Sequence, residues 1–173
     1  MKLRHYDIDG SVRFVTFCTH HRVPVFTNDL YREVFVEDLR DWLARNQIRL
    51  LAWVLMPEHV HLVLMPQEGS RLGLLIGELK LKTSKSIHDT LISAQSELSK
   101  RLISVRDGQP RFTLWQRRCY DHNCRDEKSV WEKVGYCHGN PVRRGLVLSP
   151  ADWQWSSFRS YQGMTDSPIE ISL

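Results

Sequence analysis

The stretch IRLLAWVLMPEHVHLVLM, residues 48–65, sets the framework of the fold. Residues 48–56 form an apolar run with a single charge, a pattern typical of a buried strand. A Pro-Glu pair interrupts the run, and residues 59–65 resume it as a second strand. Because the break is short, we expect the two strands to pair antiparallel as a hairpin.

Strand and helix patterns mix on both sides of this hairpin without strict alternation. We expect further strands at 11–19 and within 112–125, and helices at 28–46, 70–93 and from 126, the last one ended by Gly139 and Pro141. This order predicts an α+β sandwich, an antiparallel sheet with helices packed on one face. The length favours a single domain, residues 1–163, followed by a C-terminal tail at 164–173 in which the chain packs loosely.

Composition constrains the function only weakly. The net charge of +4 and the pI near 9.0 are compatible with a polyanionic partner without requiring one. No apolar run approaches the roughly 20 residues of a membrane span, and the N-terminus lacks the apolar segment of a secretory signal. We therefore expect a cytoplasmic protein without a membrane partner, whose four cysteines are reduced and structural.

His59 and His61 are the first candidate functional residues. Residues two apart in a strand point to the same face, so both imidazoles should project together from a rigid element. Two such rings can chelate a divalent metal, although two partly exposed histidines on a solvated face would give the same pattern. Glu58 is one residue away, and strand alternation would place it on the opposite face.

Tyr136 and Asn140 are the second candidate pair. They lie four residues apart near the end of the last predicted helix and should share one face. Tyr136 lies at the edge of the apolar stripe, where a half-buried tyrosine with its hydroxyl in water is the simpler interpretation. Asn140 precedes a proline, which disfavours the helical conformation and could turn its side chain away from the helix.

Four motifs follow one another along the chain. They are WVLMPEHVHLVLM (53–65), LWQRRCYDHNCR (114–125), YCHGNPVRRG (136–145) and DWQWSSF (152–158). Together they resemble the REP-associated tyrosine transposases, relatives of the small single-tyrosine insertion-sequence transposases, over residues 10–162.

The resemblance implies a ferredoxin-like core and the His-hydrophobic-His site of single-strand DNA endonucleases. It places the metal-binding pair on His59 and His61, the nucleophile on Tyr136 and a further metal ligand on Asn140. It implies Mg²⁺ or Mn²⁺ as the cofactor, and single-stranded or hairpin DNA formed by repetitive palindromes as the partner. The chain departs from the family's usual Tyr-Ile-His-Tyr-Asn-Pro by carrying Cys137 and Gly139.

Clusters of basic residues could contact the phosphates of such a DNA, although each could also be a solvated face. The candidates are Lys80, Lys82, Lys85, Arg117, Arg118, Arg143 and Arg144. The expected function is a transposase-like endonuclease and strand transferase that works through a 5′-phosphotyrosine intermediate, as a monomer or a homodimer. The alternatives are a catalytically silent hairpin-DNA-binding protein, a metal-dependent hydrolase of a small substrate, and an RNA-binding domain.

Overall fold

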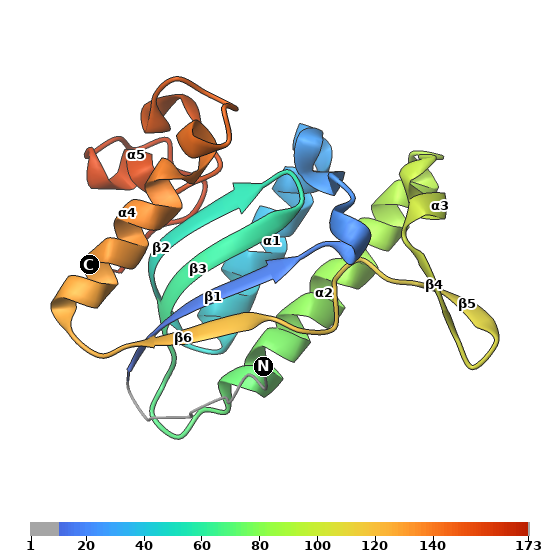
Figure 1. The fold of residues 1–173 in the computed structure, drawn as a ribbon, viewed down its shortest axis with the longest axis horizontal. Coiled ribbons are helices and arrows are strands. Elements are labelled where there is room, and N and C mark those ends of the chain that lie inside the picture. The colour runs from blue at the N-terminus through green and yellow to red at the C-terminus, as the bar shows by residue number, and fades with distance from the viewer. Residues whose placement is uncertain (1–10, 173) are drawn as a thin grey trace.

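The computed structural model describes residues 11–172 of the chain. Its centre is an antiparallel sheet of four strands in the order β2-β3-β1-β6 (Figure 1). The strands are β1 (Val12–Cys18), β2 (Arg49–Met56), β3 (His59–Met65) and β6 (Tyr120–Cys124). Together with two intervening helices they give the βαββαβ arrangement of the ferredoxin-like fold, as predicted.

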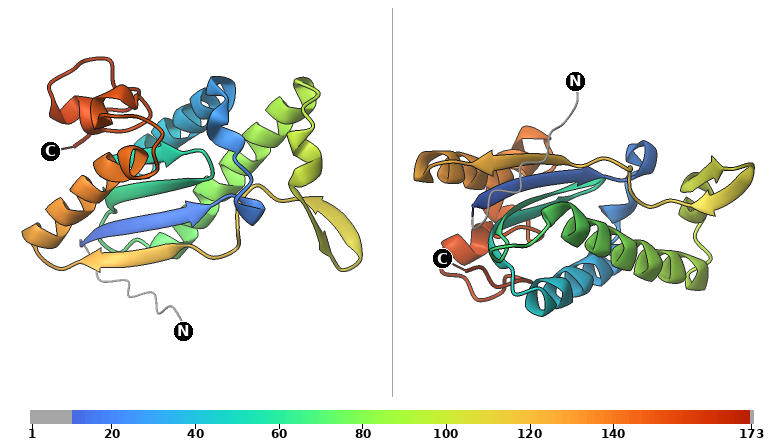
Figure 2. Two further views of the ribbon diagram at one scale, coloured as in Figure 1. Left: turned by 45° about the horizontal axis from the view of Figure 1, so that its top comes forward. Right: turned by 90° about the horizontal axis from the view of Figure 1, so that it is seen from below.

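Two long helices, α1 (Asp29–Arg45) and α2 (Leu72–Ser93), cover one face of the sheet (Figure 2). The side chain of Asn28 caps α1 by accepting a hydrogen bond from the backbone of Leu30. Phe35 of α1 packs on Trp115 and Phe26, and all three side chains are buried in the apolar core.

A third helix, α4 (Glu127–Arg143), lies over the opposite face of the sheet and packs mainly against β2 and β3 (Figure 2). Asp126 and Ser129 form a capping box at its start, at the residue predicted from the sequence. The prediction that Gly139 and Pro141 end the helix is wrong. Pro141 removes one hydrogen bond but is itself buried, and the helix continues to Arg143, shortly before Gly145, where φ is +65°.

The strand predicted within 112–125 is present as β6. Between α2 and β6 the chain also forms a one-turn helix and a separate hairpin, neither of which was predicted. These elements are α3 (Leu98–Arg101), β4 (Ile103–Arg106) and β5 (Gln109–Phe112). The connection to β6 is irregular because Trp115 turns into the core, where its indole N–H donates to the hydroxyl of Thr83 over 2.8 Å.

Shorter elements complete the fold. They are the 3₁₀ turns η1 (His20–Arg22), η2 (Val25–Thr27) and η3 (Pro150–Asp152), and the helix α5 (Phe158–Tyr161). No helix within residues 11–172 is both long and apolar enough to cross a membrane.

The C-terminal segment runs beside β2 and then packs onto the domain. The backbone N–H of Leu55 donates to the carbonyl of Trp155 over 2.8 Å, and Val54 and Ser156 form an isolated bridge. Beyond residue 163, Ile169 is buried, and the backbone N–H of Ser172 donates to the carbonyl of Leu50 over 2.7 Å. The predicted tail therefore contacts the domain at Ile169 and Ser172, while residues 164–166 are exposed.

Candidate active site

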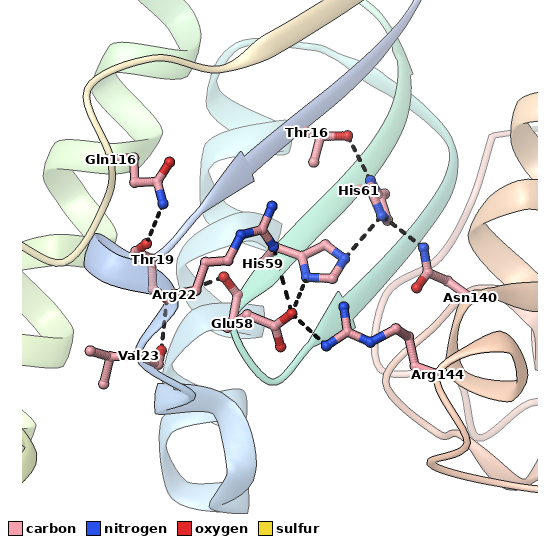
Figure 3. Close-up of polar contacts among 10 residues, drawn as sticks. All are labelled: Thr16, Thr19, Arg22, Val23, Glu58, His59, His61, Gln116, Asn140 and Arg144. Carbon is pink, nitrogen blue, oxygen red and sulfur yellow. Dashed lines mark hydrogen bonds and ion pairs between the residues drawn. The ribbon is translucent and has the colours of Figure 1, made fainter.

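The two histidines of β3 lie side by side on the face of the sheet beneath α4. Both are 5% exposed, and their Nε2 atoms are 3.1 Å apart (Figure 3). Because β3 is hydrogen-bonded to β1 on one side and β2 on the other, the backbone that carries the pair is held rigidly. The co-facing arrangement predicted from the His-Val-His spacing is present.

The outer nitrogen of each ring has its own partner. His61 Nδ1 lies 2.6 Å from the hydroxyl of Thr16, its direct neighbour across the β1–β3 register. His59 Nδ1 lies 3.1 Å from Oε1 of Glu58. These contacts fix both ring planes, and a proton on His59 Nδ1 would leave its Nε2 lone pair directed at His61.

Glu58 was expected on the far face of the sheet, and that expectation is wrong. The residue belongs to the turn between β2 and β3, so strand alternation does not apply to it. Glu58 is 6% exposed, and its carboxylate is balanced by cations, with Arg144 Nη2 at 3.0 Å and Arg22 Nη1 at 3.8 Å (Figure 3). A buried carboxylate with these partners holds the orientation of the His59 ring through Nδ1, the ring nitrogen that does not contact His61.

Burial keeps both imidazoles neutral. It lowers the pKa of His61 to about 3, with smaller contributions from His59 and the charge of Arg143. It also lowers the pKa of His59, although Glu58 opposes that shift. A neutral imidazole is the form that binds a metal, so at neutral pH the pair is ready to act as ligands.

Helix α4 brings two further side chains to the histidines. Asn140 is buried, and its Nδ2 lies 2.9 Å from His61 Nε2. The ring of Tyr136 is 5.2 Å from the ring of His61, centroid to centroid, and the residue is 44% exposed. Because α4 continues through Pro141, Asn140 stays in line with Tyr136 and both reach the same pocket.

These groups line one pocket of about 520 Å³ between α4 and the sheet. Its walls combine the histidine pair, the tyrosine and the amide with aromatic, basic and small side chains that sequence reasoning did not assign to the site. The additional lining residues are Phe14, Thr16, Cys18, Arg22, Tyr120 and Lys133. Arg143 and Arg144, two of the predicted DNA contacts, also line it. The pocket is thus lined by several cations and by the half-exposed Tyr136.

The donor set fits a divalent metal with open coordination positions. Two ligands at right angles, with bonds of about 2.1–2.2 Å, lie about 3 Å apart, and the two Nε2 atoms are 3.1 Å apart. No cluster of three His, Cys, Asp or Glu side chains suited to a metal exists within residues 11–172. Asn140 could add a ligand of another type through its carbonyl oxygen, which a turn of the amide plane would direct at the pair.

The remaining predicted DNA contacts lie away from this pocket. Lys80 and Arg117 line a second pocket of about 340 Å³ beside the β4–β5 hairpin, together with Arg106 and Arg111. Lys82 forms ion pairs with carboxylates of α1, and Lys85 lies in a surface groove beside it. Arg118 is exposed in the segment before β6.

Comparison with known proteins identifies the family to which this protein belongs. The family model described as "Transposase IS200 like" matches residues 11–104, more than half of the chain, and the protein belongs to this family. The match includes the histidine pair and ends before α4.

Individual relatives extend the match beyond residue 104. The REP-associated tyrosine transposase of Escherichia coli (strain K12) is 26% identical over 158 residues, covering 90% of this chain and 81% of the relative. A Haemophilus influenzae protein is 25% identical over 150 residues, covering 86% of this chain and 80% of its own.

Among solved structures, a REP-associated tyrosine transposase bound to a REP hairpin matches with a TM-score of 0.72. The identity is 21%, and the match covers 99% of this chain and 92% of the other. The predicted relationship to REP-associated tyrosine transposases, and with it the predicted enzyme class, is confirmed.

Proposed function

We propose that this protein is a metal-dependent endonuclease and strand transferase for single-stranded DNA that works through a 5′-phosphotyrosine intermediate. Its substrates are hairpins formed by repetitive palindromes, the kind of DNA to which the structurally similar transposase is bound. One observation carries the proposal. A half-exposed tyrosine, Tyr136, lies 5.2 Å from the ring of His61, in a pocket that also contains His59 and Asn140.

His59, His61 and Asn140 are the residues that would hold the metal. A divalent ion bound there would polarise the scissile phosphate and stabilise the charge that develops on it. Mn²⁺ suits two imidazole ligands better than Mg²⁺, which prefers oxygen. Glu58 and Thr16 support the ligands by holding the outer nitrogens of the two rings.

Tyr136 supplies the nucleophile. Its phenolic oxygen attacks phosphorus, a new O–P bond forms, and the P–O3′ bond breaks. The phenol gives up its proton, and the departing strand ends in a 3′-hydroxyl. The phosphodiester bond energy is kept in the tyrosine ester, so a 3′-hydroxyl can reverse the step and join strands without ATP.

Basic side chains around the two pockets would bind the DNA backbone. Arg143, Arg144 and Lys133 line the site itself, where an incoming phosphate would meet them. Lys80 and Arg117 lie in the second basic pocket, and we keep Arg118, Lys82 and Lys85 as more peripheral contacts.

All side chains that the reaction requires come from one chain, so a single copy is sufficient for cleavage in this proposal. Homodimer formation and a cytoplasmic location remain predictions.

Replacement of Tyr136 by phenylalanine tests the proposal. The variant should form no covalent adduct and no nicked product with a labelled single-stranded hairpin, because the attacking oxygen is gone, while hairpin affinity changes less than about twofold. A denaturing gel, on which an adduct migrates with the protein, makes the measurement. Unchanged nicking by Tyr136→Phe would refute the assignment. A wild-type protein that binds the hairpin and never cuts it would support the silent binding protein instead.

A further inference from the structure

Tyr136, Gly139 and Arg143 lie along one stripe of α4, three and four residues apart. The side chain of Arg143 turns back along this stripe. Its Nη2 donates a hydrogen bond to the backbone carbonyl of Tyr136, and its guanidinium carbon lies 4.4 Å from the centroid of the Tyr136 ring. A planar cation against an aromatic face is a favourable contact, and the hydrogen bond fixes where that cation lies.

Gly139 provides the space for this contact. A β-carbon at position 139 would lie 2.7 Å from Nη1 of Arg143 and 3.5 Å from its guanidinium carbon. Since the displaced atoms are the end of a flexible side chain, alanine would move the guanidinium and leave the backbone in place. Glycine inside a helix is otherwise unfavourable relative to alanine, so position 139 gives up helix propensity at the place where the arginine folds back.

Two rings of the site also contact the Tyr136 ring. Phe14 meets it edge to face, with centroids 5.8 Å apart and an angle of 87° between the planes. The His61 ring also meets the Tyr136 ring edge to face, with centroids 5.2 Å apart and an angle of 76° between the planes. The Tyr136 ring thus contacts Phe14 and His61 of the sheet and the guanidinium of Arg143, although the residue is 44% exposed.

We infer that Arg143 is a positioning residue that clamps the Tyr136 ring against the histidine pair, and that Gly139 is the residue that admits it. The inference rests on the proposed function, in which Tyr136 is the nucleophile. Its contribution would be to hold the phenol in a reactive orientation before DNA arrives. A small displacement of a reacting group is enough to slow a reaction severely.

The same helix offers a matched pair of variants. Gly139→Ala displaces the guanidinium, whereas Gly135→Ala adds the same methyl group where nothing lies within 4 Å. Both should keep or raise the melting temperature, because alanine favours the helix. In single-turnover reactions at saturating hairpin DNA, we expect Gly139→Ala to form the covalent adduct about tenfold more slowly than wild type and Gly135→Ala at the wild-type rate.

Two results at this stage would overturn the inference. One is an equal adduct rate in the two alanine variants. The other is a Gly139→Ala variant that binds the hairpin more weakly yet reacts at the wild-type rate once saturated, since Arg143 would then be a DNA contact only.

A double-mutant cycle tests whether Gly139 acts through Arg143. The Gly139→Ala/Arg143→Ala protein should react as slowly as Arg143→Ala alone, because the methyl group then has no guanidinium to displace. Arg143→Lys, which keeps the charge but loses the planar fork, should recover only part of the rate. If the rate of the double variant instead falls by the product of the two single-variant losses, the two residues act independently and the proposed contact is contradicted.

A readout independent of activity separates this inference from the proposed function. In protein labelled with ¹³C-tyrosine, the Tyr136 ring signal is the one absent from Tyr136→Phe. It should shift in Gly139→Ala and stay in place in Gly135→Ala. A wild-type protein without adduct, but with this shift, would refute the nicking enzyme and retain the clamp; an unmoved signal in Gly139→Ala would refute the clamp.

Discussion

The two faces of the central sheet are built from the same strands and carry opposite chemistry. Towards α1 and α2, β1 and β3 present Val15, Phe17 and Leu62, which are essentially inaccessible to solvent. Towards α4, the alternate positions of the same strands present Thr16, His59 and His61. Burial of polar groups is costly unless each has a partner, and here each ring nitrogen has one. The comparison teaches that the first face supplies stability, while the second uses that stability to hold a reactive site.

The largest expected effect is a loss of stability caused by a substitution on the apolar face. Phe35→Ala removes a fully buried ring that packs on Trp115 and Phe26, and it should lower the free energy of unfolding by about 3–5 kcal/mol. Urea titration followed by fluorescence measures the change. Leu81→Ala, at a position that is 74% exposed, is the control and should cost less than about 0.5 kcal/mol. Similar losses in the two variants would mean that the α1 face is not the main core.

The next effect falls on the polar face and should be seen in activity. His61→Ala removes a proposed metal ligand and should slow hairpin nicking about 1000-fold, because a bound metal contributes several kcal/mol to such a reaction. Its melting temperature should fall far less than that of Phe35→Ala. His88→Ala, at a partly exposed histidine on α2, serves as the control. Wild-type nicking by His61→Ala would remove the histidine pair from the mechanism.

The smallest effect concerns pH. Burial lowers the pKa of His138 to about 4, and its Nε2 lies 2.9 Å from the hydroxyl of Ser157. The pKa of a histidine in the unfolded chain is about 6.5, so the unfolded state binds more protons between these values. The stability from a neutral His138 is therefore complete above about pH 6.5 and is lost as the pH falls towards 4, at most about 3 kcal/mol.

His138→Gln isolates this contribution, since glutamine can still contact Ser157 and does not titrate. Chemical denaturation from pH 7 to pH 4 should show the difference in stability between wild type and variant shrinking as the pH falls. Stability curves that stay parallel over this range would show that another group is responsible.

The sequence predicted the parts of the site that depend on local spacing. The co-facing histidines follow from strand alternation, and the shared face of Tyr136 and Asn140 follows from helical spacing. Residues that join the site through strand register could not be predicted in this way. Thr16 lies opposite His61 only because β1 and β3 pair in one particular register.

Other sequence predictions failed because a local rule was overruled or applied where it did not hold. Alternation misplaced Glu58, which lies in a turn. Proline chemistry predicted an early end to α4, but burial of Asn140 and Pro141 against the sheet outweighs one missing hydrogen bond.

The segment that runs along β2 also determines how the sheet can grow. The outer side of β2 is occupied by the chain's own residues, through the Val54–Ser156 bridge and the hydrogen bond from Leu55 to Trp155. A second polypeptide therefore cannot add a strand at the edge of β2 unless the C-terminal segment is first displaced. Any continuous sheet shared between two copies has to be joined at β6, the opposite margin, which is also the margin whose chain leads directly into the tyrosine helix.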